Sequence, residues 1–169
     1  MRLAIVGTAL GLAACGAPPE ASRPAPRAER QLQELYRPLL AMVQDSRRSI
    51  ESFLAELGRE WIHPDEGELQ GEERARWLRK AEGDLMPRND RMCALIREKR
   101  ELVDGPLPAS WQALLDHQDG WRAAHEKWKK DGMPYGLRAP TSFPRRLEAD
   151  LKADIARLEA RLAQEHRTP

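Results

Sequence analysis

Apolar residues recur at steps of three and four along four long segments of this chain, and this spacing constrains the fold more than any other feature. In the first segment, from about 28 to 61, the series is Leu32, Tyr36, Leu39, Val43, Ser46, Ile50, Phe53 and Leu57. A period of about 3.5 residues places such side chains on one face of an α-helix, as in helical bundles. No segment shows the convincing alternation of a half-buried strand. The pattern therefore predicts an all-α fold.

The three later segments keep the same spacing. From about 72 to 103 the series is Leu78, Ala81, Leu85, Arg88, Met92, Leu95, Lys99 and Leu102. From about 108 to 131 it is Trp111, Leu114, Gln118, Trp121, His125 and Trp128. From 142 to 166 it is Leu147, Leu151, Ile155, Leu158 and Leu162. Four amphipathic helices with short connections favour antiparallel neighbours, so residues 28–166 are predicted to form an up-and-down bundle of about four helices. The alternative is a long helical hairpin that needs a partner to complete its core.

Prolines and glycines predict where these helices bend, start and stop. Pro38 and Pro87 fall inside apolar series, and each is expected to kink its helix or divide it. Gly105 and Pro106 are typical of a helix end. Ser142 is expected to cap the fourth helix, with Pro144 in its first turn.

The N-terminal residues have the layout of an export signal. Arg2 precedes an uncharged stretch from Leu3 to Ala14, which as a helix would cover only about 18 Å. That is too short to cross the hydrocarbon core of a bilayer, about 30 Å thick. A positive start, a short apolar run and small residues at the end indicate a removable signal peptide over 1–14.

The residues Leu12-Ala13-Ala14-Cys15 resemble the lipobox of bacterial lipoproteins. The resemblance implies that Cys15 is acylated, carries a diacylglycerol and often a third chain such as palmitate, and becomes the new N-terminus. The implied location is the cell envelope, and Gly16 after the cysteine is compatible with the outer membrane if the source is a diderm bacterium. The alternatives are an ordinary secretory signal with a nearby cysteine and a buried N-terminal helix. Residues 15–27 then form a lipidated, proline-rich tether, because four prolines keep this stretch extended.

Charge and cysteine usage exclude some partners. Arg2 is the only charged residue before Cys15, so the remaining chain holds 27 basic and 27 acidic residues. A neutral balance with interspersed signs provides no long-range field for nucleic acid, and none is expected as a partner. Cys93 is the only other cysteine, and its apolar neighbours predict that it is buried.

The five tryptophans allow two interpretations. Trp121 and Trp128 are seven residues apart and share one helix face. Most aromatic series at this spacing face a core, and packing is the favoured interpretation. The alternative is an aromatic surface that binds a glycan, a lipid tail or an apolar peptide.

His117 and His125 are weak candidates for metal ligands, since eight residues on a helix leave them only roughly on one face. Glu60 and His63 have the Glu-x-x-His spacing of di-iron bundles, but no second pair with that spacing accompanies them. We expect no metal site and no cofactor. No motif of nucleophilic catalysis or phosphate binding is found in the sequence, so no catalytic residue is assigned and no enzymatic activity is expected.

The connection from Asp131 to Phe143 is long for a helix–helix loop and holds three prolines or glycines after Met133. Its apolar residues are Met133, Tyr135, Leu137 and Phe143. The favoured interpretation is a loop that covers the end of the bundle, and the alternative is a protein-contact loop.

Together these features predict an envelope lipoprotein that is held at the membrane through Cys15. It is expected to act as a binding, accessory or scaffold module with an envelope protein as partner. The alternative function is a periplasmic helical-bundle sensor, or a carrier of a metal or small ligand, that uses His117 and His125.

Overall fold

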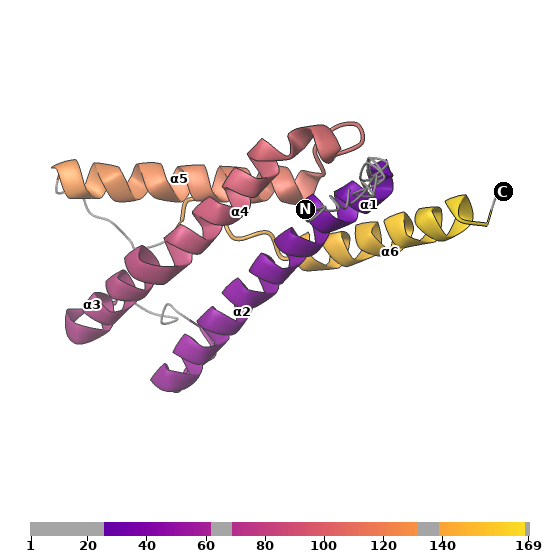
Figure 1. Cartoon of the computed structure of the whole chain (residues 1–169). Helices are drawn as coiled ribbons and strands as arrows, with labels where there is room; N and C mark the ends of the chain where they lie inside the picture. The colour runs from indigo at the N-terminus through magenta and orange to yellow at the C-terminus, as the bar shows by residue number, and fades with distance from the viewer. Residues whose placement is uncertain (1–25, 62–68, 132–138, 168–169) are drawn as a thin grey trace, which may run out of the picture.

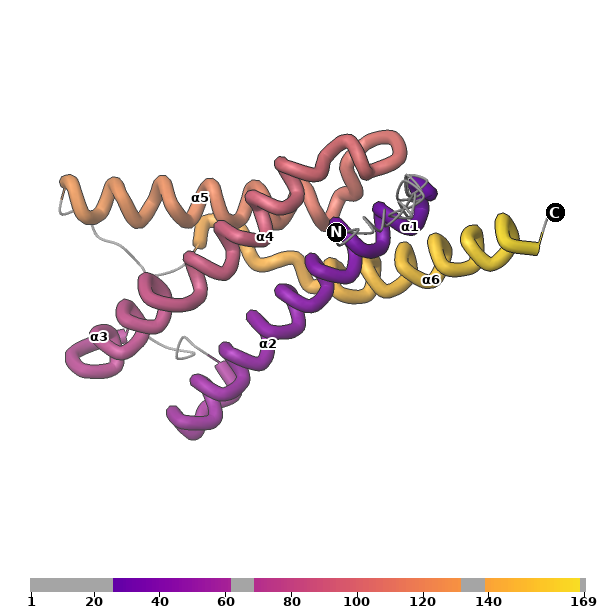
Figure 2. Tube along the Cα trace, in the orientation of Figure 1, coloured from indigo at the N-terminus to yellow at the C-terminus, as the bar shows by residue number. Residues whose placement is uncertain are grey.

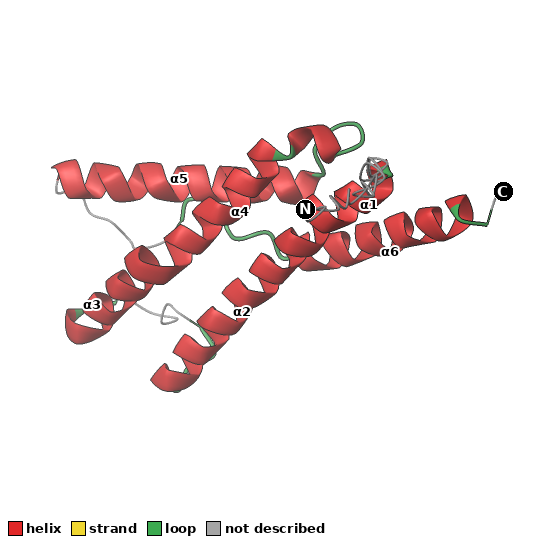
Figure 3. Ribbon diagram, in the orientation of Figure 1, coloured by secondary structure: helices red, strands yellow, loops and turns green. Residues whose placement is uncertain are grey.

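The computed structural model describes residues 26–61, 69–131 and 139–167. Within these ranges the chain is helical with short connections and no strand (Figure 3). The elements are α1 (Arg27–Gln31), the π-helical turn η1 (Leu32–Tyr36), α2 (Arg37–Leu57), α3 (Gly71–Lys80), the π-helical turn η2 (Ala81–Leu85), α4 (Met86–Glu98), the 3₁₀ turn η3 (Arg100–Leu102), α5 (Ala109–Asp131) and α6 (Leu147–Glu165). Because η1 and η2 join their neighbours without a break, these elements make four long helices, and the predicted all-α bundle is confirmed.

Each helix that contains an internal proline passes through a π-helical turn just before it. Pro38 lies two residues after η1, and Pro87 lies two residues after η2. The N–H of Arg37 donates to the carbonyl of Leu32, and the N–H of Met86 donates to that of Ala81, both five residues back. A proline lacks the amide donor and its ring crowds the carbonyl four residues earlier. The wider turn accommodates that crowding, so each helix continues past its proline with a local irregularity.

The first helix ends at a glycine that the sequence analysis did not single out. Gly58 has a φ of 64°, its N–H donates to Ala55, and the N–H of Arg59 donates to Leu54. This pair of bonds is the Schellman arrangement, which favours glycine at the left-handed position. The helix therefore stops at Leu57, four residues before the predicted end.

The fourth helix starts later than predicted. It begins at Leu147, and its N-cap residue is Arg146 with no side-chain cap, so the predicted cap at Ser142 is wrong. Phe143 instead packs its ring edge-on against His117 of α5, with centroids 5.6 Å apart. That contact holds residues 139–146 as a crossing segment, and the N–H of Leu147 bonds back to the carbonyl of Pro144 before the helix starts.

The four helices run up and down, but they overlap along only part of their length. Figures 1 and 2 show α1–α2 antiparallel to α3–α4, with α4 crossing in front of α5. α6 packs against α1, η1, the start of α2 and α5, and then extends away from α3. Within the described residues, no fourth helix therefore lies across the lower half of α2, α3 and the distal half of α5.

Two apolar clusters follow from this arrangement. The first apolar cluster contains Ala28, Leu32, Leu35, Tyr36, Leu39, Val43, Met92, Cys93, Ile96, Leu102, Val103, Trp111, Leu114, Leu147, Leu151 and Leu158. The second apolar cluster contains Phe53, Leu69, Trp77, Ala81, Leu85, Met86 and Trp121. α6 contributes leucines to the first cluster and none to the second. In the described part of the chain, no helix is both long and apolar enough to cross a bilayer.

The predicted buried face is correct for three helices and partly wrong for the second. In that helix Arg88 and Lys99 are half-buried and form ion pairs instead of core contacts. This helix also buries five residues that were not in the predicted series: Trp77, Met86, Asn89, Cys93 and Ile96. The extra residue that a π-helical turn inserts shifts the face after η2, and a constant period does not describe that shift.

Candidate functional site

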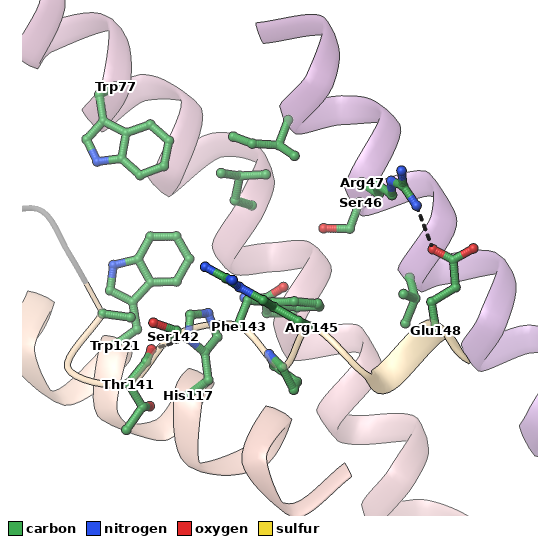
Figure 4. A pocket seen from close by; sticks show the side chains of 16 residues that line it. Ser46, Arg47, Trp77, His117, Trp121, Thr141, Ser142, Phe143, Arg145 and Glu148 are labelled. Atoms are coloured by element: carbon green, nitrogen blue, oxygen red, sulfur yellow. Dashed lines mark hydrogen bonds and ion pairs between the residues drawn. The ribbon is translucent and has the colours of Figure 1, made fainter. Parts of the chain in front are cut away.

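A cavity of about 590 Å³ lies where the two apolar clusters meet and α6 turns away (Figure 4). Its walls come from α2, α3, η2, α4, α5 and the crossing segment before α6. The lining residues are Val43, Ser46, Arg47, Ile50, Trp77, Leu85, Asn89, His117, Trp121, Ala139, Thr141, Ser142, Phe143, Pro144, Arg145 and Glu148. The volume is within the range of small-molecule sites, about 300–1,000 Å³.

One wall of the cavity is aromatic. The rings of Trp77 on α3 and Trp121 on α5 are nearly parallel, with an interplanar angle of 16° and centroids 6.4 Å apart. Figure 4 shows the two indoles next to one another along that side. Both residues are buried in the second apolar cluster, so packing against Phe53 and α4 fixes the wall. Such a wall offers a rigid apolar surface to a flat group.

Two polar side chains on the other helices also line the cavity, and neither forms a hydrogen bond with another described residue. Asn89 on α4 lines the cavity with only 3% of its surface exposed, and no hydrogen bond joins its carboxamide to another described residue. Ser46 on α2 is also buried and lines the cavity, and Figure 4 shows its hydroxyl directed inward. The two groups are therefore available to hydrogen-bond a molecule in the cavity.

His117 on α5 forms part of the cavity floor as a neutral imidazole. Its Nδ1 lies 2.6 Å from the carbonyl oxygen of Thr141. A carbonyl only accepts, so Nδ1 carries the proton and Nε2 keeps its lone pair. Burial lowers the pKa of His117, against the opposing effect of the Thr141 hydrogen bond. The ring is therefore an uncharged group that also ties the crossing segment to α5.

Charged residues are confined to the rim. Arg47 pairs with Glu51 at 2.7 Å and with Glu148 at 3.3 Å. Lys152 also pairs with Glu148 at 2.7 Å, and its hydrogen bond is the main reason that the pKa of Glu148 is lowered. Arg145 lines the same rim. The interior of the cavity is thus apolar and hydrogen-bonding, with charge only at its edge.

The structure places three of the residues singled out from the sequence around this cavity and two of them elsewhere. Trp121, Phe143 and His117 line it. Trp128 is half-buried beside the second apolar cluster, and His125 contacts its ring with centroids 5.4 Å apart. Met133, Tyr135 and Leu137 lie outside the described residues, as does Cys15. Their predicted roles remain predictions.

His125 is buried and belongs to a separate contact outside the cavity lining. Its Nε2 lies 2.9 Å from Glu82, which also pairs with Lys129 at the same distance. His117 binds a backbone carbonyl of the crossing segment instead, so the two histidines do not converge. Among the described residues, no group of three or more His, Cys, Asp or Glu side chains is placed to hold a metal ion.

Four cavity residues were not found by sequence reasoning. Asn89 and Ser46 are isolated polar residues on apolar faces, and such positions are usually boundary residues. Trp77 directly precedes Leu78, the first residue of the apolar series that was predicted for its helix. Arg145 is one of many arginines in the chain. Ser46 was placed on the predicted buried face of its helix, but only as a packing position, and no pattern in the sequence marked Asn89.

Cys93 is buried, as predicted, and it does not line the cavity. Burial raises the pKa of its thiol to about 11, so the thiolate is scarce at neutral pH. The side chain packs within the first apolar cluster, and its Sγ faces the carbonyl oxygen of Leu114 at 3.9 Å. It acts as a small apolar residue in the core.

Comparison of the chain with protein-family models, with curated proteins and with solved structures found no match.

Proposed function

We propose that this chain is a membrane-anchored binding module of the bacterial cell envelope, and that its cavity receives a small apolar ligand. The observation that carries the proposal is the cavity of about 590 Å³, which is lined by the nearly parallel indoles of Trp77 and Trp121 and by the buried polar residue Asn89. An apolar pocket with a few convergent polar groups is the usual form of a small-molecule site.

The proposed ligand site uses one of the two histidines of the small-ligand alternative. His117 lies in the cavity floor, and its Nε2 lone pair adds an acceptor to the site. His125 is engaged with Glu82 outside the cavity lining, so the proposal assigns it no contact with the ligand. A neutral His117 favours a ligand with an apolar body over a charged group at this depth.

The proposed location in the cell envelope depends on the lipobox-like residues Leu12-Ala13-Ala14-Cys15. In this proposal acyl chains on Cys15 hold the protein at a membrane, and the proline-rich residues between Cys15 and the start of α1 at Arg27 serve as the tether to the bundle. The outer membrane is the proposed location in a diderm source. A protein partner in the envelope, contacted through residues 131–143, is a further part of the proposal that the cavity does not depend on.

The cavity can be tested by filling it. We expect 2-naphthamide, an uncharged flat probe, to bind the purified full-length chain in isothermal titration calorimetry with a one-to-one stoichiometry. Ser46→Phe directs an aromatic ring into the cavity from α2 and should weaken this binding at least about tenfold, which corresponds to about 1.4 kcal/mol. The physical reason is that the ring occupies the volume that the probe needs.

The matched control is Ala41→Phe, which adds the same ring to the exposed face of α2. It should bind the probe like the wild-type chain. Circular dichroism melting of both variants checks that the fold persists. Equal binding by Ser46→Phe and the wild type would show that the probe binds elsewhere and that the cavity is not the site.

A further inference from the structure

The charged residues at the rim of the cavity differ in whether their charge is already compensated. Arg47 has two carboxylate partners, Glu51 and Glu148. Glu148 is in turn held by Lys152 and accepts a hydrogen bond from Gln44 at 3.4 Å. These residues neutralise one another within the rim. Their net effect on a ligand at the mouth is small.

Arg145 is the exception. No carboxylate of the described residues lies within ion-pair distance of its guanidinium, although the residue lines the cavity. Figure 4 shows its side chain extended across the cavity, with the guanidinium turned toward Trp121. The neighbouring Arg146 points its charge to Asp150 instead, at 3.5 Å. One uncompensated cation therefore covers the mouth of an apolar site.

An arginine in this position selects a particular chemical group. Its planar guanidinium presents parallel N–H donors that match the two oxygens of a carboxylate. Such a charge-assisted pair is stronger beside an apolar wall than in open water, because the local dielectric constant is lower. Below it, Trp77 and Trp121 offer an apolar surface, and Asn89 offers both a donor and an acceptor.

We propose that the ligand of the cavity is a small amphipathic organic anion. Its flat apolar body lies against Trp77 and Trp121, a polar substituent bonds to Asn89, and its carboxylate pairs with Arg145. This assignment rests on the proposed function of the cavity and specifies the class of molecule that it takes. Glu148 does not oppose the anion, since Lys152 and Arg47 balance its charge.

The experiment compares two probes of the same shape and different charge, 2-naphthoate and 2-naphthamide, by calorimetric titration of the full-length chain at low ionic strength. Because Arg145 is exposed, we expect the carboxylate to bind about two- to fivefold more tightly than the amide, the upper part of the range for an exposed ion pair. Arg145→Gln should remove this preference and leave the affinity for 2-naphthamide unchanged. Arg145→Lys, which keeps the charge without the planar fork, should retain part of the preference.

The matched control is Arg91→Gln, because Arg91 is exposed on α4 and does not line the cavity. It should keep the full preference for the carboxylate. Equal affinity of the wild type for both probes would overturn the anion assignment and leave the cavity proposal standing. A preference that survives in Arg145→Gln would overturn the role of Arg145. Absence of binding by either probe would overturn the proposed function as well.

Discussion

At the residue scale, the strongest electrostatic feature is a carboxylate that joins two helices. Asp84 in η2 accepts hydrogen bonds from Ser49 of α2 and from Arg88, and Lys80 lies 2.7 Å away. Lys80 also donates to the hydroxyl of Ser49 at 2.6 Å. Burial alone would raise the pKa of Asp84, but these donors outweigh it and lower the pKa to about 2 from its ordinary 3.8. Asp84 therefore favours the folded state in its charged form.

Replacing Asp84 by Asn should cost stability in a pH-dependent way. Because the folded pKa lies below the unfolded one, the stabilisation is complete above about pH 4 and disappears as the pH falls toward 2. We expect Asp84→Asn to lower the free energy of unfolding by about 1–2 kcal/mol at pH 7, after allowance for solvent screening. The difference from the wild type should shrink toward zero near pH 2. Urea unfolding at both pH values measures it.

The control for this prediction is Asp119→Asn. Asp119 forms an ion pair with Arg97 on the exposed surface, and such pairs contribute at most about 1 kcal/mol. Its effect at pH 7 should be smaller than that of Asp84→Asn. A difference between Asp84→Asn and the wild type that stays constant from pH 7 to pH 2 would contradict the account of Asp84.

At the element scale, two glycines of the long helices have opposite backbone requirements. Gly58 ends α2 in the left-handed region, with a φ of 64°. Gly83 lies within η2 at a negative φ, and an added Cβ there would meet nothing within 4 Å. A Cβ at Gly58 would also meet nothing, so only the backbone conformation distinguishes the two sites. The same substitution should therefore act in opposite directions.

We expect Gly58→Ala to destabilise the protein by about 1 kcal/mol, because an L-residue is strained in the left-handed conformation. Gly83→Ala should stabilise it by up to about 1 kcal/mol, since alanine loses less backbone entropy in a helix. Thermal and urea unfolding of the two variants provide the measurement, and each serves as the control for the other. A stabilising Gly58→Ala would mean that the first helix does not end in the Schellman arrangement.

At the scale of the whole molecule, the position of α6 creates the cavity. α6 completes the bundle around the first apolar cluster and leaves the second cluster covered by three helices (Figure 1). The crossing segment that precedes α6 then closes part of the remaining opening through Phe143. The cavity follows from the path of the chain between α5 and α6, and no single helix contains it.

The proposed membrane anchor is tested on the intact protein. Cys15→Ser should abolish incorporation of labelled palmitate and move the protein from the membrane to the soluble fraction of bacterial cells. Each buried methylene of an acyl chain contributes about 0.8 kcal/mol to membrane binding, so loss of the chains removes the attachment. Cys93→Ser, at the other cysteine, should keep both the label and the membrane location. Unchanged partitioning of Cys15→Ser would refute the lipoprotein proposal and leave the bundle unaffected.

The sequence by itself determined the four helices, because the spacing of apolar residues is a local property of each segment. It also indicated the buried face of α5, where Trp111, Leu114 and Trp121 follow a constant period. In the second helix the same method failed at Arg88 and Lys99, since a π-helical turn shifts the period there. The start of α6 was missed because Phe143 is held by His117, a contact that no local pattern encodes.

Only the tertiary structure decided the candidate site. Ser46, Trp77, Asn89, Trp121 and Arg145 come from five separate parts of the chain, and of these only Trp121 was a candidate binding residue from the sequence. Whether these residues line one cavity depends on which helices pack together and on where α6 departs from the bundle. Periodicity reports which side of a helix is buried. It does not report what that side faces, because the partner is set by packing between segments distant in sequence.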